Sequence, residues 1–381
     1  MTPNLLLAAG LLLGETNPAN SAPADSHGAN ALPVMASAIR EPSKGERSDR
    51  NVPAGAVFAQ NSPVATDASA PSPKPKSART GVRTPGVQMP VSMLKPDAVF
   101  DCPGEPDWIT IDDAVWVSIS PKDCIVRIDP QRNQVVEVVK VGKYPSSGLT
   151  VGFGSVWVPC CGDKTLCRVD VKTAKVTATI PVGIADSEGG LTVGAGSVWL
   201  LTDPKGILAR IDPVNNRVSA EIPVPPGSFV PLFSEGLLWL TSTKESLLIC
   251  LDPRTNTIID RIPVGPSPRF LACGEGSVWT LNQGDGSVSR IDAKSHKLLA
   301  TIQVGVPGNG GDIAVGEGSI WVASFEFPLS RLDPISNQVV QQFAGPGGDE
   351  IKVGRGSVWL SNLKAGNVWR LDPKKLEALR R

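Results

Sequence analysis

Residues 149–158 read Leu-Thr-Val-Gly-Phe-Gly-Ser-Val-Trp-Val, and versions of this phrase occur in seven places along the 381-residue chain. Each copy continues with a polar loop, a run similar to Arg-Ile-Asp-Pro, a turn and a further apolar segment. Seven copies with a period near 40 residues predict a repeat architecture of the solenoid or propeller type. The repeated tryptophans stand 38 to 42 residues apart, at Trp116, Trp157, Trp199, Trp239, Trp279, Trp321 and Trp359.

Four short strands can be placed within one copy. In the second copy, alternation of apolar and polar residues predicts strands at residues 149–151, 155–158, 166–169 and 175–180. The Gly-x-Gly pair fits a tight hairpin between the first two strands, because such turns need positive φ. Asp-Pro fits the turn between the third and the fourth, because Asp accepts backbone hydrogen bonds and Pro fixes φ.

The fourth strand of several copies ends at a proline, as at Pro181, Pro223 and Pro263. Proline has no backbone N–H, so it is tolerated only at the edge of a sheet, and we expect the fourth strand to be outermost. These features predict an all-β fold over residues 97–381, a seven-bladed β-propeller of four-stranded antiparallel blades.

The two ends of the repeat region predict how the ring closes. The seventh copy stops after its third strand, and residues 97–102 precede the first copy in the register of a fourth strand. We therefore expect this N-terminal strand to complete the seventh blade.

The repeated side chains are expected to be structural. One large ring per copy suits the packing of neighbouring sheets, so we predict that the seven tryptophans are core residues rather than a ligand surface. The Arg-x-Asp pairs, such as Arg127 with Asp129, are predicted to make hydrogen bonds in turns or between blades. The fourth copy has Cys250 in place of the arginine.

The N-terminal segment suggests export. Residues 5–14 are apolar and uncharged, which is too short to span a bilayer but typical of a secretory signal. We predict a signal region at residues 1–38, a disordered linker rich in Pro, Ala and Ser at residues 39–96, and a periplasmic or secreted monomer without an integral membrane span.

Composition limits the possible functions. The 37 basic residues balance the 37 acidic ones, which argues against nucleic-acid binding through a broad basic field. Two histidines and one tyrosine leave little material for acid–base chemistry. The seven cysteines match no common zinc spacing. In an exported protein Cys160 or Cys161 could form a disulfide with Cys167, or Cys102 with Cys124; reduced thiols are the alternative.

The phrases at residues 154–158 and 276–279, with the Arg-Ile-Asp-Pro and Ile-Pro-Val-Gly runs, resemble the bacterial YVTN/YncE-like seven-bladed propellers. They are more distantly similar to NHL-repeat propellers and streptogramin (virginiamycin B) lyases. The lyase resemblance implies a carbon–oxygen lyase that opens a cyclic depsipeptide with a histidine base and Mg²⁺. Outside the N-terminal segment the chain has one histidine, His296, in a predicted turn on the face opposite to the usual site, so the lyase motif is absent.

A ligand site is expected where the loops from strand four to strand one, and from strand two to strand three, meet the central channel. Carboxylates in these loops could bind Ca²⁺ or Mg²⁺, or form a solvated rim. The fifth copy brings a guanidinium and two amides together, which suits a carboxylate or phosphate. The predicted metal set is Asp107, Asp312, Asp349 and Glu350, and the predicted ligand set is Arg269, Asn282, Gln283, Asp285 and Glu188.

The sequence thus favours a binding or scaffold module that recognises a small anionic ligand or a protein partner on its loop face. Catalysis is the less favoured prediction. The alternatives are a metal-assisted enzyme, similar to a streptogramin lyase or a lactonase, and an accessory protein of a periplasmic redox or surface complex.

Overall fold

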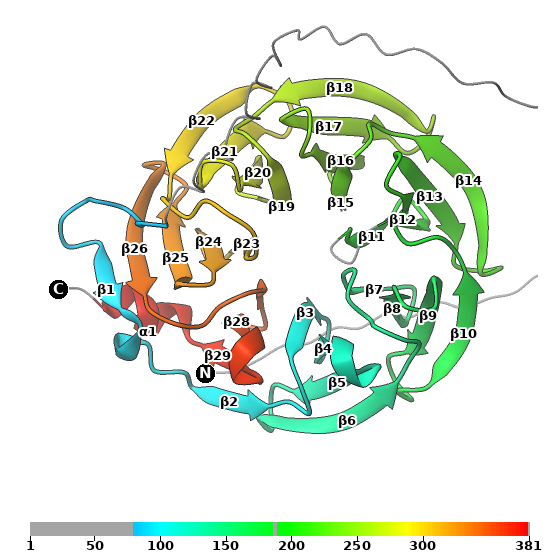
Figure 1. The fold of residues 1–381 in the computed structure, drawn as a ribbon, viewed down its shortest axis with the longest axis horizontal. Helices are drawn as coiled ribbons and strands as arrows, with labels where there is room; N and C mark the ends of the chain where they lie inside the picture. The colour runs from blue at the N-terminus through cyan, green and yellow to red at the C-terminus, as the bar shows by residue number, and fades with distance from the viewer. Residues whose placement is uncertain (1–78, 186–188, 380–381) are drawn as a thin grey trace, which may run out of the picture. The chain divides into compact units, whose positions relative to one another are not determined.

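The computed structural model describes residues 79–185 and 189–379, and these form a ring of seven blades around a channel (Figure 1). Each blade runs outward from its first strand, which lines the channel. Blades one to three contain β3 (Pro106–Ile111), β4 (Val115–Ile119), β5 (Cys124–Asp129) and β6 (Gln134–Lys140); β7 (Thr150–Gly152), β8 (Ser155–Cys160), β9 (Thr165–Asp170) and β10 (Val176–Pro181); and β11 (Leu191–Gly194), β12 (Ser197–Asp203), β13 (Ile207–Asp212) and β14 (Arg217–Pro223).

The remaining blades follow the same order. Blade four contains β15 (Ser228–Ser234), β16 (Leu237–Ser242), β17 (Leu247–Asp252) and β18 (Thr257–Pro263), and blade five contains β19 (Pro268–Gly274), β20 (Ser277–Asn282), β21 (Ser287–Asp292) and β22 (Leu298–Gln303). Blade six contains β23 (Asp312–Gly316), β24 (Ser319–Ser324), β25 (Phe327–Asp333) and β26 (Gln338–Ala344). Blade seven contains β27 (Ile351–Gly354), β28 (Ser357–Asn362), β29 (Asn367–Leu371) and the N-terminal β2 (Ala98–Asp101).

The predicted fold class is confirmed. The strands of each blade pair antiparallel, and β10, β14 and β18 are outermost in their sheets and end at proline. Closure is confirmed as well, because β2 pairs antiparallel with β29, from Ala98 opposite Arg370 to Asp101 opposite Asn367.

Folded structure is present before the predicted boundary at residue 97. The strand β1 (Gln88–Pro90) pairs in parallel with β26 as a fifth strand of blade six, and the 3₁₀ helix η1 (Val91–Met93) follows it. Met89 is buried, and the backbone N–H of Gly81 donates to the carbonyl of Gly305 (2.9 Å). Residues 79–96 are therefore part of the folded unit rather than of a disordered linker. The predicted signal region and the rest of the linker lie outside the described residues.

Each of the seven tryptophans exposes at most 1% of its surface, as predicted for core residues. In blade two the indole N–H of Trp157 donates to the carbonyl of Gly152 (3.1 Å). A Cβ on Gly152 would lie 2.7 Å from Val193 of the next blade, whereas positive φ occurs at Phe153 and Gly154. Gly152 is thus required by blade packing, and the expectation that it supplies positive φ is wrong.

In blades two, three, five and seven the arginine of the third strand donates hydrogen bonds to the next blade, one of the two outcomes predicted, whereas Arg127 of blade one lies over Trp116 (5.4 Å). Arg168 lies over the ring of Trp157 and donates to the Pro213 carbonyl (2.6 Å) and the Asn216 side chain (3.0 Å) of blade three. The same bonds recur at Arg210, Arg290 and Arg370. Those of Arg370 reach Pro130 and Asn133 of blade one and so reinforce the closure.

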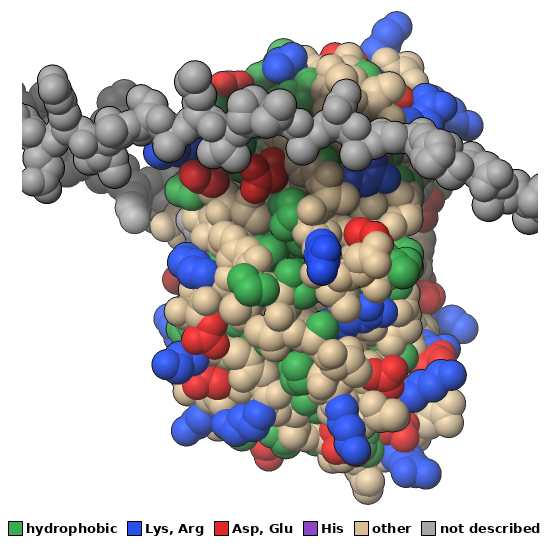
Figure 2. All heavy atoms as spheres, turned by 90° about the vertical axis from the view of Figure 1, so that its right-hand side faces the viewer, with side chains coloured by type: hydrophobic (Ala, Val, Ile, Leu, Met, Phe, Trp, Pro, Cys, Tyr) green, Lys and Arg blue, Asp and Glu red, His purple; other side chains and the backbone are tan. Residues whose placement is uncertain are grey.

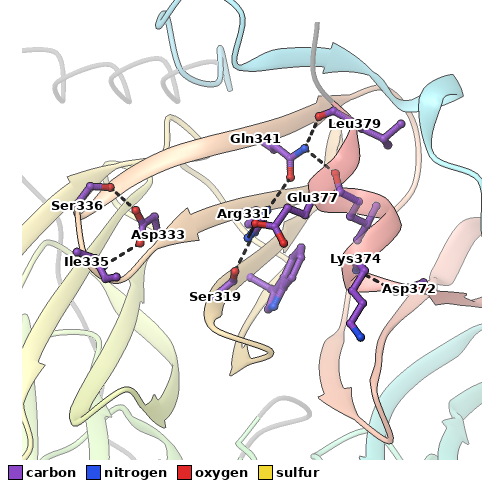
Figure 3. Close-up of polar contacts among 12 residues, drawn as sticks. Ser319, Arg331, Asp333, Ile335, Ser336, Gln341, Asp372, Lys374, Glu377 and Leu379 are labelled. Atoms are coloured by element: carbon purple, nitrogen blue, oxygen red, sulfur yellow. Dashed lines mark hydrogen bonds and ion pairs between the residues drawn. The ribbon is translucent and has the colours of Figure 1, made fainter.

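In blade six the arginine of the third strand contacts the C-terminal helix instead of a turn of the next blade (Figure 3). After Asp372 the chain enters the helix α1 (Pro373–Ala378), because the outer strand of blade seven comes from the N-terminal side. Arg331 therefore pairs with Glu377 of α1 (3.2 Å) and donates to Ser319 (2.8 Å), and Gln341 donates to the carbonyl of Leu376 (2.7 Å).

Blade four has no such arginine contact with the next blade, because Cys250 stands in place of the arginine. His296 from the turn of blade five lies edge-on to Trp239, with ring centroids 5.1 Å apart, and its Nδ1 is 3.0 Å from an Asp260 oxygen. The indole N–H of Trp239 has no hydrogen-bond partner within the described chain. His296 is thus a packing residue on the face opposite the loop face.

The outer surface on the side of β10 and β14 carries charged side chains of both signs, interspersed with small apolar groups (Figure 2). Within residues 79–185 and 189–379, no helix has the length and apolar character needed to cross a membrane.

Candidate functional site

The loop face is the side of the ring where first strands begin, and two features of it can hold ligands: the mouth of the channel and a pocket between blades six and seven. It is formed by loops that join an outer strand to the next inner strand and loops that join the second strand of a blade to the third. Those nearest the candidate sites are residues 264–267, 283–286, 304–311, 325–326, 345–350 and 363–366.

Two of the predicted metal ligands lie close together at the channel, but both pair with a lysine. Asp312 in β23 and Glu350 before β27 occupy equivalent positions in neighbouring blades, and each is less than 5% exposed. The ammonium group of Lys352 lies 2.6 Å from an oxygen of Asp312 and 2.5 Å from an oxygen of Glu350. The ammonium therefore lies where a cation shared by these two carboxylates would bind.

The cluster is electrostatically coupled. Burial, and then the charge of Asp312, raises the pKa of Glu350 well above its ordinary value, although Lys352 opposes this rise. Burial alone would lower the pKa of Lys352, but the two carboxylates outweigh it and raise that pKa. The protonated lysine is thus stable in this site, and a divalent cation would have to displace it.

The other two carboxylates of the predicted metal set do not complete a site with this pair. Asp107 in β3 accepts hydrogen bonds from Ser146 (2.9 Å) and Ser120 (3.2 Å). Asp349 is half-buried, and its charge contributes to the raised pKa of Glu350. In the part of the chain that the structure describes, no group of three or more His, Cys, Asp or Glu side chains is arranged to hold a metal ion.

Most residues of the predicted ligand set make hydrogen bonds within blade five and its adjoining loops. Asn282 is fully buried and donates to the hydroxyls of Ser287 and Ser289 (2.9 Å each). Asp285 accepts bonds from the backbone and the hydroxyl of Ser287, and Gln283 donates to the Gly310 carbonyl (3.4 Å). Glu188 lies outside the described residues.

Arg269 lies at the channel mouth and stacks on aromatic rings. Its guanidinium is 4.4 Å from the centroid of Phe229 and 5.8 Å from that of Phe270. Phe270 in turn meets Trp108 of blade one, with ring centroids 6.1 Å apart. Residues from blades one, four and five thus come together at the loop-face end of the channel, and Arg269 is the member of the predicted ligand set that lies among them.

The blade six–seven pocket has a volume of about 380 Å³. The Nζ of Lys364 lies 5.3 Å from the ring centroid of Phe325, and Arg79 approaches the same ring at 5.8 Å. Arg79 also forms an ion pair with Glu326 (3.0 Å). The pocket is lined by Phe325, Glu326, Pro346, Gly347, Gly348, Asn362, Lys364, Ala365 and Trp369.

Sequence reasoning missed Lys352, Phe325, Lys364, Trp369 and Arg79. Lys352 stands two residues after Glu350 in a strand, so the two side chains share a face, and period-two alternation was a usable signal. Arg79 lies about 250 residues from Phe325 in the sequence, and the repeat pattern carries no signal for that contact.

All seven cysteines are free thiols. Among the predicted pairs, the sulfurs of Cys160 and Cys167 are 3.6 Å apart in adjacent strands of blade two. The hydrogen bond that Cys160 donates lowers the pKa of the Cys167 thiol, whereas burial raises the pKa of Cys102 to about 12.

The folded unit resembles known propellers. No protein-family model and no curated protein matches the chain. A streptogramin B lyase structure shares 19% identity over 72% of this chain and 96% of its own, with a TM-score of 0.61. Virginiamycin B lyase from Staphylococcus aureus shares 16% over 72% and 98% (TM-score 0.60), and BamB from Moraxella catarrhalis 13% over 72% and 91% (0.54). These similarities are in fold.

Proposed function

We propose that this protein is a binding module that recognises a small anionic ligand with an aromatic or apolar body in the blade six–seven pocket. The observation that carries the proposal is the ammonium group of Lys364 held over Phe325 at the wall of a hollow of about 380 Å³. Ligand pockets of this size commonly combine apolar walls with a few polar groups.

The charges around the pocket favour an anion. Glu326 contributes the carboxylate of the lining, and its charge is compensated by Arg79. Lys364 is exposed and supplies a positive charge to a ligand. Phe325 and Trp369 offer aromatic surface to the body of that ligand. Gly347 and Gly348 bring the backbone close, since a Cβ on Gly348 would lie 2.5 Å from Pro328.

The test is calorimetry with a panel of aromatic carboxylates and aryl phosphates, each compared with its uncharged amide or alcohol analogue. We expect at least one anion to bind and Lys364→Ala to weaken it about tenfold, the loss of one charge-assisted contact. Lys122→Ala is the matched control, because Lys122 occupies the corresponding 3₁₀ turn of blade one, η2 (Ser120–Lys122). Equal effects of the two substitutions, or preference for the uncharged analogues, would overturn the proposal.

The enzymatic alternative, a lyase or lactonase assisted by Ca²⁺ or Mg²⁺, requires a metal and a base. The residues that would hold a metal, Asp312 and Glu350, are paired with Lys352, and His296 packs on Trp239 on the opposite face. Two measurements address this alternative: titration with Ca²⁺ and Mg²⁺, and incubation with a streptogramin B depsipeptide. Metal binding that is lost in Asp312→Asn, together with ring opening, would favour it over the binding module.

Export is part of the same proposal, since the apolar run at residues 5–14 suits a secretory signal. Fractionation of cells expressing the full chain tests it, and the shortened, signal-cleaved protein is expected outside the cytoplasm. The uncleaved chain in the cytoplasm would contradict export without bearing on the pocket. An accessory role in a redox or surface complex remains a prediction, which co-purification from the same fractions addresses.

A further inference from the structure

The interior of the channel has a polar side and an apolar side at a single level of the ring. In every blade, one residue of the first strand lies directly opposite the repeated tryptophan of the second strand, and all seven of these residues line a cavity of about 270 Å³. They are Lys352, Thr110, Thr150 and Thr192 in blades seven, one, two and three, followed by Leu232, Ala272 and Ala314 in blades four, five and six.

This division follows the order of the blades. The four polar residues come from consecutive blades around the closure, and the three apolar residues come from the remaining consecutive blades. A threonine hydroxyl both donates and accepts hydrogen bonds. A molecule in the cavity therefore meets hydrogen-bonding groups along one edge and aliphatic side chains along the other.

The charges at this level are internally balanced. Lys352 is paired with Asp312, and Glu350 completes the cluster with a pKa raised by burial and by Asp312. A ligand carboxylate would face these two acidic side chains, and a ligand ammonium would compete with Lys352. The cluster thus disfavours charged ligands of either sign.

We propose that the channel is a second ligand site, which takes a small uncharged molecule with one hydrogen-bonding edge and one aliphatic edge, such as a short-chain amide, alcohol or lactone. The volume corresponds to about nine water molecules, which sets the size of the ligand. This site is separate from the blade six–seven pocket and does not depend on the function proposed for it.

The test is calorimetry of the full chain with hexanamide, hexanoate and hexylammonium. We expect hexanamide to bind, and the two charged analogues to bind at least tenfold more weakly. Thr150→Val removes a hydroxyl while keeping the shape and is expected to weaken hexanamide about fivefold, the loss of one hydrogen bond. Thr301→Val is the matched control, because Thr301 is exposed on the outer strand of blade five.

A substitution that fills the cavity provides a second, independent test. Ala272→Leu adds an aliphatic side chain to the apolar side and is expected to abolish hexanamide binding, while the thermal midpoint confirms that the variant folds. Lys364→Ala is expected to leave hexanamide binding unchanged. Equal binding of the three probes, no binding of hexanamide, or full binding by Ala272→Leu would overturn the proposal.

Discussion

At the scale of the residue, blades two, three, five and seven share a pair: a buried tryptophan, and an arginine that stacks on it and donates to the next blade. A hydrogen bond to a charged group contributes about 1.5 to 3 kcal/mol. The Asp-Pro-x-x-Asn turn exists partly to receive this arginine, since both its proline carbonyl and its asparagine oxygen accept from the guanidinium.

The exception in blade four provides a prediction. Cys250→Arg alone should lower the free energy of unfolding by about 2 kcal/mol, because His296 occupies the space of the turn asparagine and the guanidinium would be buried without its usual partner. Adding His296→Asn should recover that loss, since it supplies the oxygen that Asn256 and Asn337 supply elsewhere. Urea unfolding of the two single variants and the double variant gives the coupling energy, expected to be favourable by about 1 kcal/mol or more. Additive effects would mean that residues 250 and 296 do not interact across blades four and five.

The acidic cluster predicts a pH dependence of stability. The pKa of Glu350 is raised in the folded protein above its ordinary value of 4.5, first by burial and then by Asp312. The folded state therefore binds this proton more tightly than the unfolded state, and the resulting stabilisation is complete below pH 4.5 and is lost as the pH rises through the folded pKa. Glu350→Gln has no proton to lose, so the wild type should lose stability relative to it as the pH rises above 4.5. Parallel urea curves across that range check the prediction, and a constant difference would contradict it.

At the scale of the element, β2 is the strand on which closure depends. Phe100 of β2 is 3% exposed and its ring centroid is 5.6 Å from that of Trp359, whereas its neighbour Val99 is 50% exposed. Neighbouring residues of a strand face opposite sides, so Phe100 and Val99 can be compared directly. The difference in stability between their alanine variants shows whether β2 pairs in this register.

Phe100→Ala should therefore lower the free energy of unfolding by about 3 to 5 kcal/mol, the cost of a cavity at a buried aromatic position. Val99→Ala should change it by about 0.5 kcal/mol or less. Denaturant unfolding with two-state fitting measures both values. Equal losses, or a larger loss for Val99→Ala, would mean that β2 pairs differently or not at all.

The sequence predicted the elements well because the repeat samples each strand seven times. The tryptophan period, the Asp-Pro turns and the proline-terminated strands gave the blade count, the strand order and the closure. The sequence was less informative about contacts that occur only once in the ring. The pairing of β1 with β26 and the contact of Arg79 with Phe325 join segments about 250 residues apart, and neither follows from the period.

The candidate site was predicted less well, for a related reason. Residues such as Asn282 and Asp285 were selected because they are polar and lie near loops, but polar side chains in β-turns often bond to their own hairpin. Asp312 and Glu350 lie close together in the structure, where both pair with Lys352. Lys352 carries no signal as a metal ligand, because an ammonium group does not bind a cation, although it lies on the same face as Glu350.

At the scale of the whole molecule, the closed ring places two candidate sites at different depths. The blade six–seven pocket opens on the loop face and carries a positive charge, whereas the channel cavity is internally neutral and half apolar. Both depend on the closure, because Lys364 and Lys352 belong to blade seven, whose outer strand comes from the N-terminal side. Loss of β2 is therefore expected to disturb both sites.

A crystal structure of the full chain would show directly whether β2 closes the ring. We expect seven blades, with Ala98–Asp101 hydrogen-bonded antiparallel to Asn367–Leu371 and Arg370 bonded to the Pro130 turn of blade one. A ring of six or eight blades, or a seventh blade whose outer strand comes from another part of the chain, would contradict it.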